Sequence, residues 1–207
     1  GLADLVLPEI PKLRLEVDEH HHHKDVYEHS ITVLEQAIAH EDRLGGPNLV
    51  IRLAALLHDI GKPKTRAFIE GGGVSFHHHE VVGARLAKKR LQALRFDNET
   101  IDAVELLTTL HLRFHGYGEG EWTDSAVRRY VRDAGEYIIH LHVLTRADCT
   151  TRNKAKAARL SATYDSLEAR IAVLMEQEEL SKIRPDLDGQ QVMEILNLKP
   201  SREVGQA

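Results

Sequence analysis

The sequence predicts an all-α protein, and three observations support that prediction. Apolar residues recur at helical spacing in several long segments, and no stretch shows the strict apolar–polar alternation of a half-buried strand. Residues that cap or end helices bound most of these segments. A chain of 207 residues with 42% hydrophobic content suffices for one large domain, or for one domain with an appendage. We therefore expect a helical core followed by a helical extension.

The first three predicted helices follow one another with short turns between them. Residues 25–40 place apolar side chains at helical spacing and end before a Gly-Gly-Pro-Asn turn. Residues 49–60 are apolar on almost every side, which predicts a central buried helix, and Gly61 and Pro63 end it. Residues 79–96 form the next helical pattern, after a turn with three glycines.

The second half of the chain continues the same pattern. Residues 98–114 open with Asn98 as the expected N-cap. Residues 122–135 begin with the capping residues Thr, Asp and Ser and end at a glycine. Residues 136–153 lead into a polar helix that we expect to run to about residue 180. No repeat and no low-complexity linker interrupts these segments.

Composition and charge exclude several classes of protein. A net charge of −5 gives no global reason to expect nucleic-acid binding, so such a role has to come from local patches. The single cysteine, Cys149, excludes an internal disulfide and favours a reducing compartment. No apolar run approaches the roughly 20 residues of a membrane span, and the first residues lack the layout of a signal peptide. We expect a cytoplasmic protein without a membrane partner.

Six polar side chains are predicted to point from five helices toward the core. A single histidine on an apolar helix face is usually a hydrogen-bonded core residue. Several buried carboxylates and imidazoles together are different, because burying a carboxylate without compensation is expensive. One divalent cation would compensate all of them. The six residues are His29, His58, Asp59, His79, His111 and Asp148.

The expected ligand types limit which metal ions can bind and which reactions those ions can support. Mixed imidazole and carboxylate ligands suit an octahedral ion with open water positions. We expect a divalent cation, Mg²⁺, Mn²⁺, Fe²⁺, Ni²⁺ or Co²⁺, whereas the lack of cysteine ligands disfavours a closed structural zinc site. Open positions allow the ion to polarise a phosphate oxygen and to lower the pKa of bound water.

The order of these residues resembles a known family. His29, the His58–Asp59 doublet and Asp148 resemble the H…HD…D pattern of the HD-domain metal-dependent phosphohydrolases. The resemblance implies that these four residues hold the metal ion and that Asp59 is also catalytic. His79 and His111 stand where many members of the family place further metal or phosphate ligands.

Three more residues are candidates beside this set. His78 is a rival for His79, because histidines stand where glycine often precedes the family's histidine. His23, in the four-histidine tract at residues 20–23, is an extra candidate at the mouth of the site. Lys62 can offset the charge of a substrate phosphate as a point charge, and a plain solvent-exposed lysine is the alternative.

A wider resemblance covers nearly the whole chain. Segments such as "LLHDIGKPKTR", "HLRFHGYGEGEWTDSAVRRYVRDAG" and "RADCTTRN" resemble the C-terminal part of bacterial tRNA nucleotidyltransferases (CCA-adding enzymes) of the actinobacterial type, or of the related poly(A) polymerases. This implies a neck remnant at residues 1–19, an HD phosphohydrolase domain at 20–150, and a truncated helical RNA-binding body and tail at 151–207. The nucleotidyltransferase head needs a Gly-Ser turn and an Asp-x-Asp pair, and neither occurs before residue 57, so we expect no nucleotide addition.

A basic run follows Asp148. No acidic residue lies between Asp148 and Asp165, whereas four cations do. Such a run can contact tRNA phosphates, and a solvated helix face is an equally good interpretation. The four residues are Arg152, Lys154, Lys156 and Arg159.

The leading hypothesis is a metal-dependent phosphohydrolase, acting as a phosphatase or 2′,3′-cyclic phosphodiesterase in RNA 3′-end processing. Its partners would be the 3′ end of tRNA and nucleotide phosphoesters. The alternatives are a free-standing HD-family nucleotide hydrolase and a non-catalytic RNA-binding module. Repulsion among the clustered ligands also predicts that Asp59→Ala raises the stability of the metal-free protein.

Overall fold

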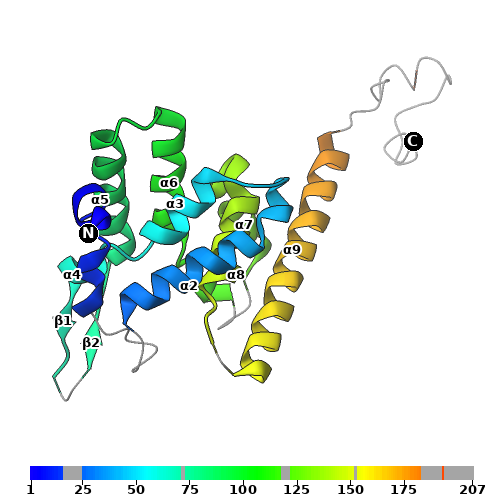
Figure 1. The fold of residues 1–207 in the computed structure, drawn as a ribbon. Helices are drawn as coiled ribbons and strands as arrows, with labels where there is room; N and C mark the ends of the chain where they lie inside the picture. Colours follow the sequence, from blue (N-terminus) through cyan, green and yellow to red (C-terminus); the bar gives the residue numbers. More distant parts are fainter. Residues whose placement is uncertain (16–24, 71–72, 118–121, 152, 183–192, 194–207) are drawn as a thin grey trace. The chain divides into compact units, whose positions relative to one another are not determined.

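The computed structural model confirms an all-α fold with one small two-stranded sheet (Figure 1). Its residues fall into two compact units, Gly1–Glu168 and Ala169–Ala207, which are considered separately. All six candidate metal ligands belong to the first unit. The structure describes residues 1–15, 25–70, 73–117, 122–151, 153–182 and 193.

The elements follow the predicted order closely. The first half of the chain contains α1 (Leu2–Val6), η1 (Pro11–Leu15), α2 (Val26–Ala39), η2 (Glu41–Leu44), α3 (Leu49–Leu57), α4 (Lys62–Thr65), β1 (Ala67–Phe68) and β2 (Val74–Ser75). The second half contains α5 (His79–Ala93), α6 (Asn98–Leu110), η3 (Arg113–Tyr117), α7 (Asp124–Ala134), η4 (Gly135–Tyr137), α8 (Ile138–Asp148) and α9 (Lys154–Lys182).

Helix α3 lies at the centre of the first unit. It packs against α2, α6 and α8, and α5 packs along α6 (Figure 1). Four of its residues, Ile51, Ala54, Ala55 and Leu57, are fully buried, which confirms the predicted central helix. Its first residue, Leu49, is exposed because the helix emerges from the core at its N-terminal end. The C-terminal end of α3 therefore points its next residues, His58 and Asp59, into the interior.

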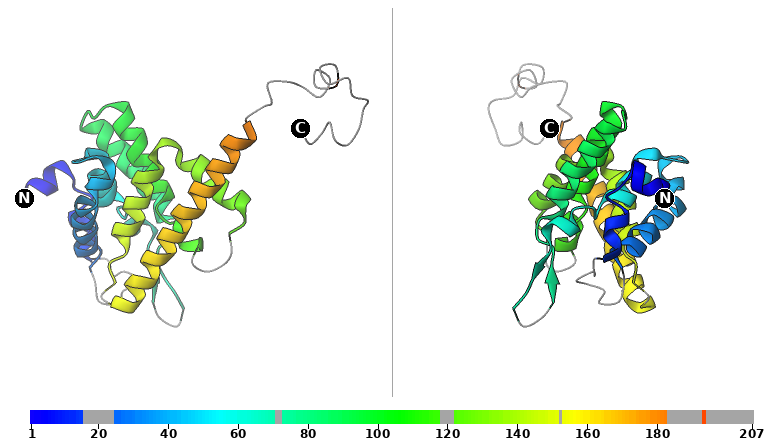
Figure 2. Two further views of the ribbon diagram at one scale, coloured as in Figure 1. Left: turned by 90° about the vertical axis from the view of Figure 1, so that its right-hand side faces the viewer. Right: turned by 60° about the vertical axis from the view of Figure 1, so that its left-hand side comes forward.

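Two details differ from the expectations. The glycine-rich turn before α5 is a short antiparallel hairpin in which Ala67 pairs with Ser75. It extends away from the helical body in Figure 1 and in the right-hand view of Figure 2. The N-cap of α6 is Asp97 rather than Asn98, because the Asp97 carboxylate accepts a hydrogen bond from the amide of Thr100 at 2.8 Å.

The first residues of the chain contribute to the core. Ile10 and Leu13 are buried in the same cluster as Leu57, Ile60 and Leu91. The part of the predicted neck remnant around Ile10 and Leu13 is thus packed in the core, whereas Leu2 and Leu5 are exposed. Among the described residues, none of the helices is long and apolar enough to cross a membrane.

Candidate metal centre

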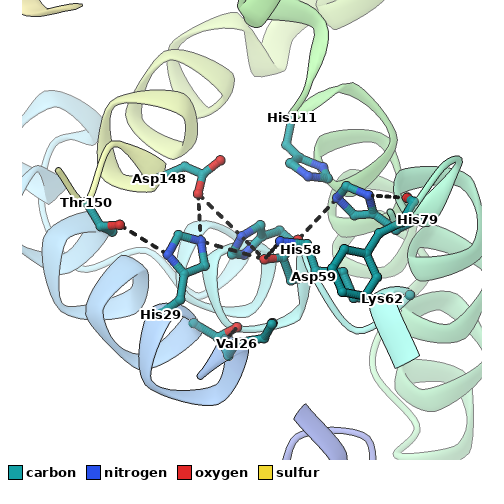
Figure 3. A network of polar contacts seen from close by, with 12 residues as sticks. Val26, His29, His58, Asp59, Lys62, His79, His111, Asp148 and Thr150 are labelled. Carbon is teal, nitrogen blue, oxygen red and sulfur yellow. Dashed lines mark hydrogen bonds and ion pairs between the residues drawn. The ribbon is translucent and has the colours of Figure 1, made fainter. Parts of the chain in front are cut away.

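The predicted cluster forms at one place in the first unit, where Figure 3 shows its six side chains pointing toward one another. His58 caps the end of α3, His111 caps the end of α6, and Asp148 is the last residue of α8. His29 comes from the buried side of α2, and His79 is the first residue of α5. All are buried except Asp148, whose side chain is 15% exposed. The structure therefore brings together residues that are up to 119 positions apart, from 29 to 148.

Four ligand atoms form a ring in which nitrogen and oxygen alternate. Nε2 of His29 lies 2.9 Å from Oδ1 of Asp148 and 3.6 Å from Oδ2 of Asp59. Nε2 of His58 lies 3.2 Å from the same Asp59 oxygen and 3.6 Å from the same Asp148 oxygen. Ligands that bind one octahedral ion at about 2.1 Å are separated by about 3.0 Å along an edge. The spacing of this ring is close to that expected for neighbouring ligands of one cation.

Asp59 joins this ring to a second group. Its other oxygen, Oδ1, lies 3.2 Å from Nε2 of His79. The rings of His79 and His111 have centroids 5.3 Å apart. One ligand atom from each of Asp59, His79 and His111 falls within 4.8 Å of the others, and the same holds for His29, His58 and Asp148. The two oxygens of Asp59 thus serve two adjacent groups of ligands.

Backbone carbonyls orient three of the imidazoles. The Nδ1 atoms of His58, His79 and His111 lie 2.8, 2.8 and 2.6 Å from carbonyl oxygens three residues earlier in the chain. A carbonyl oxygen can only accept, so each Nδ1 carries the hydrogen and donates it. When the imidazole is neutral, Nε2 therefore presents its lone pair to the site, which is the arrangement of a metal-binding histidine.

The helix ends add a favourable field for a cation. Helices α3, α6 and α8 all end at the site, at His58, His111 and Asp148. The C-terminus of a helix carries a partial negative charge from its last carbonyl groups. Three such ends at one place favour a bound cation and disfavour an anion.

The buried polar atoms of the site indicate whether its residues fit a metal ion. Four of them, Nε2 of His58, His79 and His111 and Oδ2 of Asp59, make no hydrogen bond of regular geometry, although Oδ2 of Asp59 forms an ion pair with Nζ of Lys62 at 3.0 Å. A buried polar atom without a partner is costly, and proteins keep few of them. These atoms approach one another without the geometry of donor and acceptor, because they point toward common positions instead. The donor set therefore fits divalent cations.

The charges of the metal-free site are balanced by a proton. Burial lowers the pKa of His58, but Asp59 and Asp148 outweigh it and raise that pKa to about 10. Burial raises the pKa of both carboxyl groups, but neighbouring cations and hydrogen bonds lower each of them well below its usual range. Burial and the charge of His58 lower the pKa of His111 to about 3, so His111 stays neutral. These balanced charges favour the opposite of the sequence-based expectation, namely that removing Asp59 destabilises the metal-free protein.

Lys62 is part of the site rather than a solvent-exposed lysine. Its side chain is buried, and its Nζ atom lies 3.0 Å from Oδ2 of Asp59. The ammonium group also lies 5.6 Å from the centroid of the Phe76 ring. A buried ammonium group places a fixed positive charge at the edge of the ligand cluster.

The histidine candidate His78 does not join the cluster. His78 has φ +63° as the residue before α5, and this left-handed conformation turns its side chain into solvent, where it is 83% exposed. His79 takes the inward position instead. His23 lies outside the described residues. Sequence reasoning missed Thr150, whose hydroxyl oxygen lies 3.3 Å from Nδ1 of His29, because a threonine after a helix carries no signal of such a contact.

Metal binding by this site should be coupled to proton release. A divalent ion replaces the His58 proton, so we expect metal affinity to rise about tenfold per pH unit between pH 7 and 9. The raised pKa means that the charged His58 stabilises the fold fully below about pH 6.5, and that this stabilisation is lost as pH rises through about 10. Titration calorimetry with Mn²⁺ in buffers of different ionisation enthalpy measures the protons released. Heats that are independent of the buffer would contradict this prediction.

The basic run starts α9 in the first unit. Lys154, Lys156 and Arg159 are exposed, and Arg152 lies outside the described residues. Lys156 and Arg159 are three positions apart and share one side of the helix, whereas Lys154 lies on another side. Among the described residues of this run, Lys156 and Arg159 are therefore the pair that can face one phosphate backbone together.

Comparison with known proteins places this geometry in a family. The HD domain family matches residues 26–175. The chain is 32% identical over its whole length to an A-adding tRNA nucleotidyltransferase from Deinococcus radiodurans, of which it covers 46%. It is 34% identical over its whole length to a CC-adding tRNA nucleotidyltransferase from Thermus thermophilus, of which it covers 44%. A multifunctional CCA protein from Alkalilimnicola ehrlichii is 33% identical over 56% of this chain and is covered over 26% of its own length.

These similarities agree with the arrangement of the side chains. The chain spans about half the length of the first two of these relatives. HD domains are metal-dependent hydrolases that bind divalent cations, and the matched region includes all six clustered residues. The chain belongs to the HD-domain family and is related to the tRNA nucleotidyltransferases, as the order of its motifs predicted.

Proposed function

We propose that the chain is a metal-dependent phosphohydrolase that acts on phosphoesters at RNA 3′ ends, with tRNA as the natural source of those ends. One observation carries this proposal. Buried imidazole nitrogens and carboxylate oxygens from six residues converge beside a buried lysine, and that arrangement suits cations and an anionic substrate together. Two relatives are tRNA nucleotidyltransferases by name, and for that reason we propose tRNA as the source of these 3′ ends.

The ligands divide between two ions. His29, His58, Asp148 and Oδ2 of Asp59 would hold one ion, and Oδ1 of Asp59 would share the second with two histidines. Those two histidines are His79 and His111. Bound ions of this kind lower the pKa of coordinated water and polarise a phosphate oxygen.

The chain's own residues do the remaining work. Lys62 holds a positive charge that offsets the charge of the phosphate group as it enters the buried site. His111 stays neutral and keeps its Nε2 lone pair available, since its Nδ1–H is donated to the carbonyl of Thr108. Asp59 aligns both ligand groups through its two oxygens.

Hydrolysis of 2′,3′-cyclic nucleotides by the purified chain tests the proposal. We expect activity with Mn²⁺, Ni²⁺, Co²⁺, Mg²⁺ or Fe²⁺ and none with a chelator. His79→Asn should lower kcat by about a hundredfold or more, because it removes a ligand of the site. His78→Asn is the matched control, since asparagine tolerates the left-handed conformation at this exposed position. Equal activity of the two variants would count against the site.

We also propose that three parts of the chain have different functions. Residues 20–150 form the hydrolase domain, residues 1–19 are part of a neck, and residues 151–207 belong to an RNA-binding body. The match of the HD domain family to residues 26–175 supports the central part of this division. The chain by itself should incorporate neither CTP nor ATP into tRNA, and labelled nucleotide in the product would contradict that expectation.

RNA binding by the start of α9 should depend on the two cations that share one side of the helix. Replacing Lys156 and Arg159 by alanine should weaken binding of a tRNA transcript and reduce the magnitude of its logarithmic salt slope by about 2, since two phosphate contacts are lost. Lys154→Ala is the control and should change the slope little. Filter binding at several salt concentrations measures these slopes. An unchanged slope in the double variant would leave this stretch as a solvated helix face.

A further inference from the structure

The β1–β2 hairpin exposes large apolar side chains that the fold does not bury. Phe68 is 78% exposed and Ile69 is 52% exposed. Burial of a side chain of this size contributes about 1.5–3 kcal/mol to stability. Two such side chains exposed next to each other at the tip of a projecting hairpin are therefore unusual for a surface without a partner. In Figure 1 and in the right-hand view of Figure 2 the hairpin stands apart from the helices.

Both ends of the hairpin lead into residues of the metal centre or residues that contact it. Helix α4 leads into β1, and its first residue is the buried Lys62 that contacts Asp59. Strand β2 leads into the buried Phe76, whose carbonyl oxygen accepts the Nδ1–H of His79. A strand advances about 3.3 Å per residue, so a molecule that touches Phe68 lies within a few nucleotides of the ligand cluster.

Exposed cations lie on the segment that leads into the hairpin. Residues 60–69 carry three cations, and acidic residues flank them at Asp59, which pairs with Lys62, and at the exposed Glu70. Lys64 and Arg66 are exposed on the segment. The guanidinium carbon of Arg66 lies 5.4 Å from the centroid of the Phe68 ring. An exposed aromatic ring with a guanidinium group beside it is a surface on which nucleobases stack while cations contact phosphates.

We propose that the hairpin binds the single-stranded RNA that precedes the terminal phosphoester, with a base stacked on Phe68 and phosphates near Lys64 and Arg66. This inference rests on the proposed hydrolase function and narrows its substrate class. The enzyme acts on the end of an oligonucleotide in preference to a free mononucleotide. The exposed Lys64 and Arg66 beside the Phe68 ring favour a polyanion over a purely apolar protein partner as the occupant.

Two substrates with the same terminal nucleotide test this inference. One is a 2′,3′-cyclic mononucleotide, and the other is a short oligoribonucleotide that ends in the same cyclic phosphate. Phe68→Ala should raise KM for the oligonucleotide about tenfold, as expected for the loss of one stacked base. It should leave KM for the mononucleotide and both kcat values within about twofold. Phe68→Trp should restore the oligonucleotide KM, and Ile69→Ala, at the residue after β1, should change it little because isoleucine offers no aromatic face for stacking.

Binding measured without hydrolysis separates this inference from the proposed function. Fluorescence anisotropy of the labelled oligonucleotide, recorded with a chelator, should also show about tenfold weaker binding by Phe68→Ala. If the native chain hydrolyses neither substrate but this difference in binding persists, the hairpin proposal stands and the hydrolase function fails. The hairpin proposal is overturned if Phe68→Ala leaves oligonucleotide KM and anisotropy unchanged, or raises both KM values equally. Loss of self-association with unchanged oligonucleotide affinity would likewise overturn it, in favour of a protein contact.

Discussion

Asp59→Asn should abolish phosphoester hydrolysis, with a loss in kcat of about 1,000-fold or more. The carboxylate of Asp59 offers one oxygen to each of the two ligand groups, at 3.2 Å from His58 and 3.2 Å from His79. An asparagine side chain has almost the same shape, but it has only one oxygen and its nitrogen is a donor. One of the two groups therefore loses its ligand whichever way the amide is turned. Asp42→Asn, at an exposed position in η2, is the control and should hydrolyse at the native rate.

The same variant should be less stable without metal. Asp59 is buried beside the protonated His58 and the ammonium group of Lys62, and their charges hold its pKa well below the usual range. Breaking such a buried pair costs about 3 kcal/mol in the free energy of unfolding. Urea unfolding with a chelator measures this loss, and Mn²⁺ should raise the unfolding midpoint of the native chain far more than that of the variant. Hydrolysis by Asp59→Asn at the native rate would exclude Asp59 from the site.

Gly61→Ala should disrupt the site through the backbone. A Cβ atom at Gly61 would lie 2.1 Å from the carbonyl oxygen of His79 and 2.7 Å from the amide nitrogen of Gly83. Both are backbone atoms, so the turn after Asp59 and the start of α5 would have to move apart. We expect a loss of about 3 kcal/mol in stability, together with weaker metal binding, because Asp59 and His79 are carried by the two segments that separate.

Gly83→Ala provides the matched comparison on the other side of this contact. Its Cβ would lie 3.3 Å from the amide nitrogen of Gly61 and 3.3 Å from the carbonyl oxygen of His58, which is tight but close to what structures tolerate. Alanine in place of glycine inside a helix gains about 1 kcal/mol, which offsets much of that crowding. We expect a net change within about 1 kcal/mol for Gly83→Ala. Equal stabilities of the two variants in urea unfolding would contradict the proposed contact.

Local patterns in the sequence determined the fold class and the identity of most clustered residues. Helix periodicity is a property of neighbouring residues, so it identified α2, α3, α5, α6, α7 and α8 to within a few positions. It also indicated which side of α2 carries His29, since helical spacing places His29 beside Val26 and Val33 on the buried side. The doublet of His58 and Asp59 stood out because two polar residues end an otherwise apolar helix. The capping residue of α6 was misplaced by one position, since Asp97 and Asn98 have similar preferences.

The tertiary structure alone decided the roles of several residues within the site. Nothing local separates His78 from His79; the left-handed conformation of His78 does so, at the point where the start of α5 packs against Gly61. The two-sided position of Asp59 and the burial of Lys62 likewise depend on how α4 and α5 meet. The exposure of Phe68 depends on a hairpin that no periodic pattern predicts, because each of its strands has only two residues. Such features arise from contacts between segments distant in sequence, where the free energy depends on packing and charge pairing rather than on local propensity.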